Sequence, residues 1–176
     1  TAADFGFTDP IDAASVAGAN ALTAVKITTL PGAGTLQNNG VNVTAGQFVS
    51  LADINSGKLV FTPAANANGA GYAAFTFQVE DDGGTANAGV DLDTSARTMT
   101  VNVTSVNDAP VGTNNTVTTL EGAAYTFTAA DFGFTDPADA GSVAGADALT
   151  AVKITTLPGA GTLQDDGVNV TAGQFV

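Results

Sequence analysis

Acidic side chains are the residues of this chain whose type and spacing could do chemistry. The 176 residues include 17 Asp and Glu but only four Lys and Arg, which gives a net charge of -13. Asp131, Asp136 and Asp139 fall within nine residues, and the same spacing recurs near the start of the chain. Hard cations such as Ca²⁺ bind about six to eight oxygen atoms, largely from carboxylates and carbonyls. The pattern therefore predicts divalent cation binding, with solubility and self-repulsion as the alternative role of the acid excess.

Residue types that other functions need are missing. The chain has no His and no Cys, so the commonest general base, thiol nucleophiles and disulfides are excluded. The Gly-rich stretch 31–34 lacks the Lys of a phosphate-binding loop. A strongly negative chain is a poor ligand for nucleic acids or anionic membranes, and no apolar run reaches membrane length. We expect no enzyme activity, no nucleic-acid partner and no membrane insertion.

The acidic stretch belongs to an internal repeat. Residues 1–49 recur as residues 128–176, a period of 127 residues, and 44 of the 49 paired positions are identical. A uniform array serves length and mechanics more often than catalysis, because an enzyme gains little from a second copy of its site. The chain is therefore expected to start and stop within repeats. The five differing pairs are Ile11/Ala138, Ala14/Gly141, Asn20/Asp147, Asn38/Asp165 and Asn39/Asp166.

Strand patterns dominate the elements that must position these acids. Apolar and polar residues alternate over 75–80 and 98–103, the period of a half-buried strand. Further strand candidates are Lys58–Thr62, Leu22–Leu30 and Tyr125–Ala129. Ser50–Ser56 is predicted to form one helical turn, with Asp53 as its cap.

Two hairpins are predicted from their turn residues. Asn39-Gly40 and its later counterpart Asp166-Gly167 each lie between short apolar segments. Asn-Gly and Asp-Gly favour type I′ turns, because that turn needs positive φ at two successive residues.

Together these elements predict an all-β fold, with each repeat an antiparallel β-sandwich. The hydrophobic content of 44% and ten Phe residues are enough for a core. The break between repeats is placed at 106–110, because Pro110 cannot donate to a continuing strand ladder. Residues 1–110 would be a repeat that lacks its first strands, and residues 111–176 the N-terminal part of the next, near-identical repeat.

Three segments carry a resemblance to a known family. Val106-Asn107-Asp108-Ala109-Pro110 resembles the "NDxP" junction of cadherin-type repeats. Residues 77–84 resemble the family's late strand and Asp-Gly turn, and residues 130–139 resemble the acidic loop after its second strand. The chain thus resembles the cadherin-like, immunoglobulin-like tandem repeats of giant bacterial surface adhesins exported by type I secretion. The resemblance implies an extracellular location on a bacterial cell surface and Ca²⁺ between neighbouring repeats.

The resemblance and the strand order together define the expected metal ligands. Two acidic loops, 131–147 (4–20 in the earlier copy) and 81–95, should meet at the linker end of a sandwich. Glu121 stands where the family commonly has a calcium-ligating Glu, whereas residues 63–69 lack the family's mid-domain acidic pair, which implies one or two ions per junction. The alternative is that Asp before Pro, and Asp81-Asp82-Gly83, only form turns. The candidate ligands are Asp4, Asp9, Asp12, Asp81, Asp82, Asp91, Asp93, Asn107, Asp108, Glu121, Asp131, Asp136 and Asp139.

The expected function is that of a spacer repeat in a biofilm or host-attachment adhesin, made rigid by calcium and contacting neighbouring repeats of the same chain. A first alternative is a subunit of a filament or sheath, in which identical chains complete each other by strand exchange. A second alternative is a carbohydrate- or peptide-binding module that uses the row Thr98, Thr100 and Thr104. Outward Thr residues are also ordinary sheet surface.

Overall fold

The computed structural model describes residues 1–16 and 18–176 and divides the chain into two compact units, Thr1–Ser105 and Val106–Val176. The division falls just before the linker 106–110, which therefore belongs to the second unit. Each unit contains one copy of the repeated sequence.

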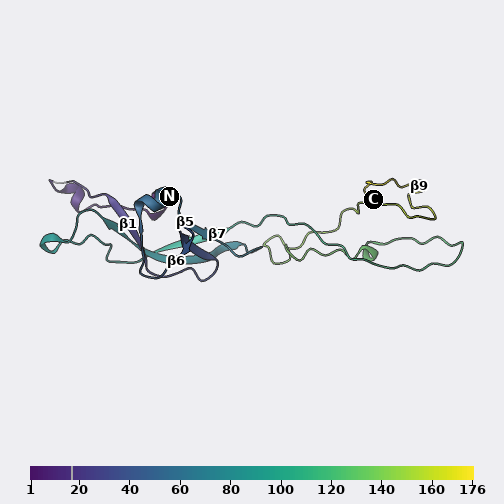
Figure 1. Cartoon of the computed structure of the whole chain (residues 1–176), viewed down its shortest axis with the longest axis horizontal. Helices are drawn as coiled ribbons and strands as arrows, with labels where there is room; N and C mark the ends of the chain where they lie inside the picture. Colours follow the sequence, from purple (N-terminus) through teal and green to yellow (C-terminus); the bar gives the residue numbers. More distant parts are fainter. Residues whose placement is uncertain (17) are drawn as a thin grey trace. The chain divides into compact units, whose positions relative to one another are not determined.

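The first unit is built from antiparallel strands in two sheets (Figure 1). One sheet has four strands in the order β4-β1-β6-β7, and the other has three in the order β3-β2-β5. The chain is thus all-β, as predicted, with only short helices. The strands are β1 (Leu22–Ile27), β2 (Thr35–Asn38), β3 (Val41–Asn42), β4 (Phe48–Ser50), β5 (Leu59–Thr62), β6 (Gly69–Asp81) and β7 (Arg97–Val103).

One apolar core lies between these sheets. Val25 and Ile27 of β1 are fully buried, and Phe77 of β6 packs edge-on against Phe5 at 5.0 Å between ring centroids. Leu36 brings the three-stranded sheet into the same core. Burying each such side chain stabilises the fold by about 1.5–3 kcal/mol. The alternating pattern that predicted β6 and β7 therefore marks real inward and outward faces.

Both predicted hairpin turns are present. Asn39 and Gly40 have φ of 51° and 76°, and Asp166 and Gly167 have φ of 46° and 77°. These two positive values are what a type I′ turn requires. In the second unit the turn joins β8 (Gln164–Asp165) to β9 (Val168–Asn169).

The predicted helical turn is α1 (Leu51–Asn55), but its cap is not Asp53. The Asp53 N–H donates to the Ser50 side chain at 3.1 Å, so Ser50 is the N-cap. The Asp53 carboxylate instead accepts hydrogen bonds from Lys58 at 2.8 Å and Asn38 at 3.0 Å. The hydrogen bond from Lys58 is the main reason that the pKa of Asp53 is lowered. A cap must precede the first turn, and Asp53 already lies inside it.

The second unit has few regular strands. Apart from β8 and β9 it has the bridges Val111–Thr135 and Lys153–Phe175, and its trace is otherwise irregular (Figure 1). The predicted strand Tyr125–Ala129 is wrong, because these residues pair with no strand. In the first unit β6 provides the partner of β1, and the second unit contains no counterpart of β6. Among the described residues, no helix is both long and apolar enough to cross a membrane.

Candidate metal centre

Three carboxylates of the second unit lie together. Asp136, Asp139 and Asp147 each offer one oxygen, and these oxygens lie within 4.8 Å of one another. Asp136 and Asp139 are 5% exposed, whereas Asp147 is exposed. Among residues 1–16 and 18–176, this is the group of acidic side chains whose geometry could hold a metal ion.

The loop between Asp136 and Asp147 is closed by its own hydrogen bonds. The Asp147 N–H donates to Asp136 Oδ2 at 2.7 Å across eleven residues. The Ser142 N–H donates to the Asp139 carbonyl at 2.9 Å, and a further turn links Ser142 to Gly145. Pro137 fixes the backbone directly after Asp136. These contacts hold the three carboxylates together where the two ends of the loop meet.

The linker packs on this loop. The Asp108 N–H donates to Asp139 Oδ2 at 2.8 Å, which fastens the linker to the acidic group. Val111 and Thr135 exchange two hydrogen bonds of 2.8 Å in an antiparallel bridge. Thr113 lies so close to Gly133 that a Cβ at Gly133 would overlap its side chain. The segment 108–113 and the loop therefore form one local structure.

One buried oxygen in this group has no partner. Asp136 Oδ1 is buried and accepts no hydrogen bond, although Asp136 Oδ2 accepts one from the Asp147 N–H. An unsatisfied buried oxygen of a charged group is costly and rare, and a bound ion can remove that cost. The two neighbouring carboxylates repel Asp136 further. A divalent cation would satisfy Asp136 Oδ1 and offset this repulsion.

The first copy of the loop is arranged differently. The Asn20 N–H donates to Asp9 Oδ2 at 2.8 Å, as the Asp147 N–H does to Asp136. The Asn20 side-chain amide also donates to Asp12 Oδ2 at 3.1 Å, and the Asp12 N–H approaches Asp9 Oδ1 at 3.4 Å. Asp9 and Asp12 are half-buried. Every carboxylate in this copy thus has a protein donor.

Asp4 and Asp131, also predicted as ligands, close capping boxes instead. Each accepts hydrogen bonds at the start of a 3-10 helix, η1 (Ala2–Phe5) for Asp4 and η4 (Ala129–Phe132) for Asp131. The Thr128 N–H donates to Asp131 Oδ2 at 2.7 Å and lowers the pKa of Asp131. Asp131 also accepts a hydrogen bond from the Tyr125 hydroxyl, which raises the pKa of Tyr125.

The second predicted acidic loop, 81–95, contacts the first copy through Asp82. The Ala21 N–H donates to Asp82 Oδ1 at 2.7 Å, and the Asp82 N–H donates back to the Ala21 carbonyl. The two loops thus adjoin at one end of the first unit. The Asp82 carboxylate, however, already accepts a backbone N–H there.

The other acids of that loop have separate partners. Asp81 Oδ1 accepts from the Gly83 N–H within its own turn, and the Asp91 carbonyl accepts from the Asp81 N–H. Asp93 forms a salt bridge with Arg97 at 2.8 Å, and this hydrogen bond lowers the pKa of Asp93. The carboxylates of Asp81 and Asp93 thus have partners of their own, and among the described residues no acid of this loop belongs to the group that could hold a metal.

The remaining predicted ligands flank the site or lie outside it. The Asn107 side chain donates to the Asp108 carbonyl at 3.1 Å, so it contacts the linker. Glu121 is exposed in the turn closed by Leu120 and Ala123. Asp147 was missing from the predicted ligands. The Asn20/Asp147 exchange is the sequence signal that could have found it, because it adds a carboxylate to one copy alone.

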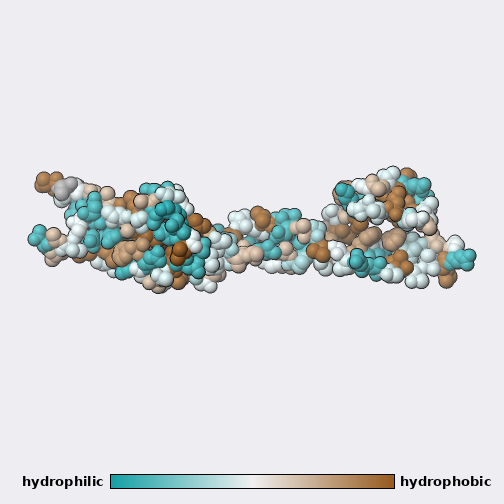
Figure 2. Space-filling model, viewed as in Figure 1, coloured by the Kyte–Doolittle hydropathy of each residue, from teal (hydrophilic) through white to brown (hydrophobic). Residues whose placement is uncertain are grey.

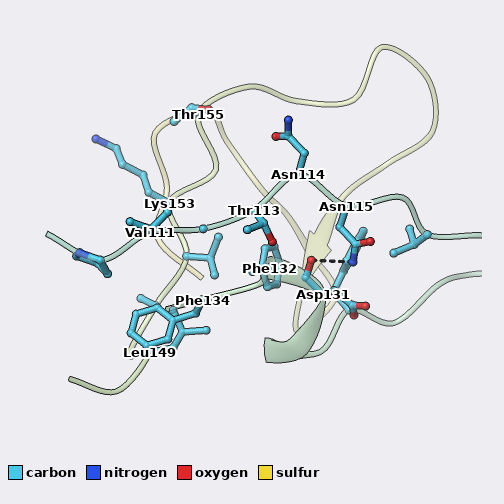
Figure 3. Close-up of a pocket in the computed structure, with 16 residues that line it drawn as sticks. Val111, Thr113, Asn114, Asn115, Asp131, Phe132, Phe134, Leu149, Lys153 and Thr155 are labelled. Atoms are coloured by element: carbon cyan, nitrogen blue, oxygen red, sulfur yellow. Dashed lines mark hydrogen bonds between the residues drawn. The ribbon is translucent and has the colours of Figure 1, made fainter. Parts of the chain in front are cut away.

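A pocket of about 700 Å³ lies beside the linker in the second unit. Its walls are the segment 111–115 and apolar side chains that include Phe132, Phe134 and Leu149 (Figure 3). Asp131 and Lys153 are its titratable residues, and Lys153 points away from Asp131. The pocket therefore mixes polar and apolar surface, and the described residues that line it include no paired acid and base.

No protein-family model matches the chain, and no curated protein or solved structure is significantly similar to it. Function must therefore be argued from the site itself.

Proposed function

We propose that this chain is part of a tandem-repeat spacer in which a bound divalent cation, Ca²⁺ by its oxygen chemistry, fixes the linker between repeats. Such a spacer would consist of immunoglobulin-like sandwiches and would belong to an extracellular bacterial adhesin. The 127-residue repeat, the all-β fold and the acidic group beside the linker support this proposal. Neighbouring repeats would be its main partners.

The observation that carries the proposal is the buried, unpartnered Asp136 Oδ1 inside a group of three carboxylates. Ca²⁺ bonds to oxygen at about 2.3–2.6 Å, so two ligands of one ion lie at most about 5 Å apart. The spacing of up to 4.8 Å among the three oxygens fits one such ion. Water and backbone carbonyls would supply its remaining ligands.

An ion at this place would act on the linker through Asp139. Asp139 Oδ2 already accepts the Asp108 N–H, and an ion on Asp139 would hold the carboxylate in that orientation. The last strand of the first unit, β7, ends at Val103. If Asp108 is held in place, only residues 104–107 remain free between Val103 and Asp108. Few backbone dihedral angles can then change in the linker.

Calorimetry and amide hydrogen exchange test this proposal on the whole chain. We expect Ca²⁺ to bind with a stoichiometry of one and to slow exchange of the Asp108 and Asp147 N–H groups, with the chelated protein as the control. At a calcium concentration about 100 times the dissociation constant, protection should rise by about 2.7 kcal/mol. No heat of binding and unchanged exchange would refute the proposed role of the ion.

A second candidate function, assembly of identical chains, is favoured by the open apolar face of the second unit. Five core residues of the first unit have identical counterparts in the second that are less buried, whereas Val170, like its counterpart Val43, is buried. Apolar atoms are visible on the surface of the second unit (Figure 2). A segment like 50–105 from another chain could cover them, because the receiving residues are the same in both copies. The less buried counterparts are the half-buried Phe132, Val152, Ile154 and Leu163 and the exposed Val176.

Sedimentation velocity at increasing protein concentration separates the two candidates. Assembly predicts larger species at high concentration, which Ile154→Glu should abolish because it charges the receiving face. Ala123→Glu, in the exposed turn closed by Leu120 and Ala123, is the matched control and should leave assembly intact. A chain that stays monomeric throughout would exclude assembly and leave the spacer proposal untouched.

A further inference from the structure

One sequence difference between the copies lies at the metal centre itself. Asn20 of the first copy stands where the second copy has Asp147, and both residues donate their backbone N–H to the equivalent Asp. The backbone of the loop is therefore closed in the same way in both copies. What differs is the group that the side chain presents to the two other acids.

In the first copy, the Asn20 side chain supplies a hydrogen-bond donor to a neighbouring acid. Its Nδ2 donates to Asp12 Oδ2 at 3.1 Å, which places the partial positive charge of an amide hydrogen beside the carboxylate. Asn20 also packs tightly on the neighbouring turn, where a Cβ on Gly83 would come within 2.5 Å of Asn20 Nδ2. Rotating the amide to offer its oxygen to an ion would lose the bond to Asp12 and disturb this contact.

In the second copy, no side-chain amide is present to do this. Ionised Asp147 can only accept hydrogen bonds, so it adds a third negative charge and no donor. Calcium affinity rises with the number of charged ligands in a site.

We propose that the Asn20/Asp147 exchange makes the second loop dependent on an ion and the first loop independent of one. Each copy of the loop would then be closed either by an internal amide or by Ca²⁺, according to whether Asn or Asp stands at this position. This inference rests on the proposed metal function, because it assigns that function to one copy and removes it from the other.

Reciprocal substitutions test the inference through the stoichiometry of Ca²⁺ binding in calorimetry. Wild-type protein should bind one ion, Asp147→Asn should weaken that binding by at least about tenfold, and Asn20→Asp should create a second site. Two ions in the wild type, or one ion whose affinity Asp147→Asn leaves unchanged, would overturn the inference while the metal function stands. No ion in the wild type would overturn both.

Amide exchange without calcium provides a second readout, which tests whether the amide replaces the ion. Asp147→Asn should slow exchange of the Ser142 and Gly145 N–H groups in the presence of chelator, because the introduced side-chain amide can donate to Asp139. Asp147→Ala is the matched control: it also removes the charge and the ion ligand but supplies no donor. Equal exchange rates in the two variants would show that the amide has no such role.

Discussion

The two copies of the acidic loop, 1–20 and 128–147, differ at three of 20 positions, yet their carboxylates differ in hydrogen-bond partners and in burial. In the first copy every carboxylate meets a protein donor, and the loop is half-open to water. In the second copy the linker lies on the loop, two carboxylates are buried, and one oxygen has no partner.

The comparison teaches that the acid count alone does not define the site. Asp9 and Asp12 are identical in type and spacing to Asp136 and Asp139. What differs is the third side chain, Asn20 or Asp147, and the Asp12 N–H, which approaches Asp9 Oδ1 in the first copy alone. Segment 108–113 in addition lies on the second loop. The third carboxylate separates the two loops, and the burial of Asp136 and Asp139 adds to the affinity expected of the second.

The largest expected effect comes from removing the unpartnered carboxylate. Asp136→Ala should weaken Ca²⁺ binding by about 100-fold or more, because it deletes a buried ligand and the acceptor that closes the loop. Asp9→Ala, the same change in the first copy, should leave the Ca²⁺ affinity unchanged. Calorimetry on both variants checks this, and equal losses would mean that the two loops do not differ in function.

An intermediate effect is expected from the glycine under the linker. Gly133 and Gly6 have φ of 55° and 57°, so an alanine at either place costs about 1–2 kcal/mol of backbone strain. Only Gly133→Ala also pushes against Thr113, whereas Gly6 faces open space. Gly133→Ala should therefore speed amide exchange at Val111 and Thr113 and lower the Ca²⁺ affinity. Gly6→Ala should change neither the exchange rates nor the Ca²⁺ affinity. If the two variants had the same effects, the contact between the linker and Gly133 would not contribute to the difference between the loops.

The smallest effect should come from the capping carboxylates, which the two loops share. The pKa of Asp131 is lowered, so its contribution to stability is present above the ordinary value near 3.8 and is lost as the pH falls through the lowered pKa. Asp131→Asn should slightly destabilise η4 at pH 7 and leave Ca²⁺ binding intact. Amide exchange at Asp131 and Gly133 measures the first, and calorimetry the second. A large loss of Ca²⁺ affinity would make Asp131 part of the site after all.

Local patterns in the sequence predicted the local structure well. Alternation identified β6 and β7, and Asn-Gly and Asp-Gly identified both hairpins, because each depends on residues close in sequence. The strand predicted at 125–129 failed because a strand needs a pairing partner, which no local pattern provides. Ser50 rather than Asp53 caps α1 because the helix begins at Leu51, directly after Ser50, so that Asp53 already lies in its first turn.

The site was only partly predictable for the same reason. Asp136, Asp139 and the linker residue Asp108 could be placed together from the repeat and the junction motif. Asp93 could not be assigned to Arg97, nor Asp4 and Asp131 to capping, without the side-chain contacts. The burial of Asp136, which leaves one of its oxygens without a partner, depends on how the chain packs and cannot be predicted from the order of the residues.

The long strand β6 has a consequence for the way the first unit carries a load. Residues 69–77 of β6 pair with β7 and residues 77–81 pair with β1, so β6 connects the two strand pairs of the four-stranded sheet. The chain leaves this sheet through β7, whose hydrogen bonds lie perpendicular to the strand. Tension applied to Ser105 along β7 would therefore shear the whole β6–β7 ladder at once, and several bonds would have to break in the same event before the strand could slide.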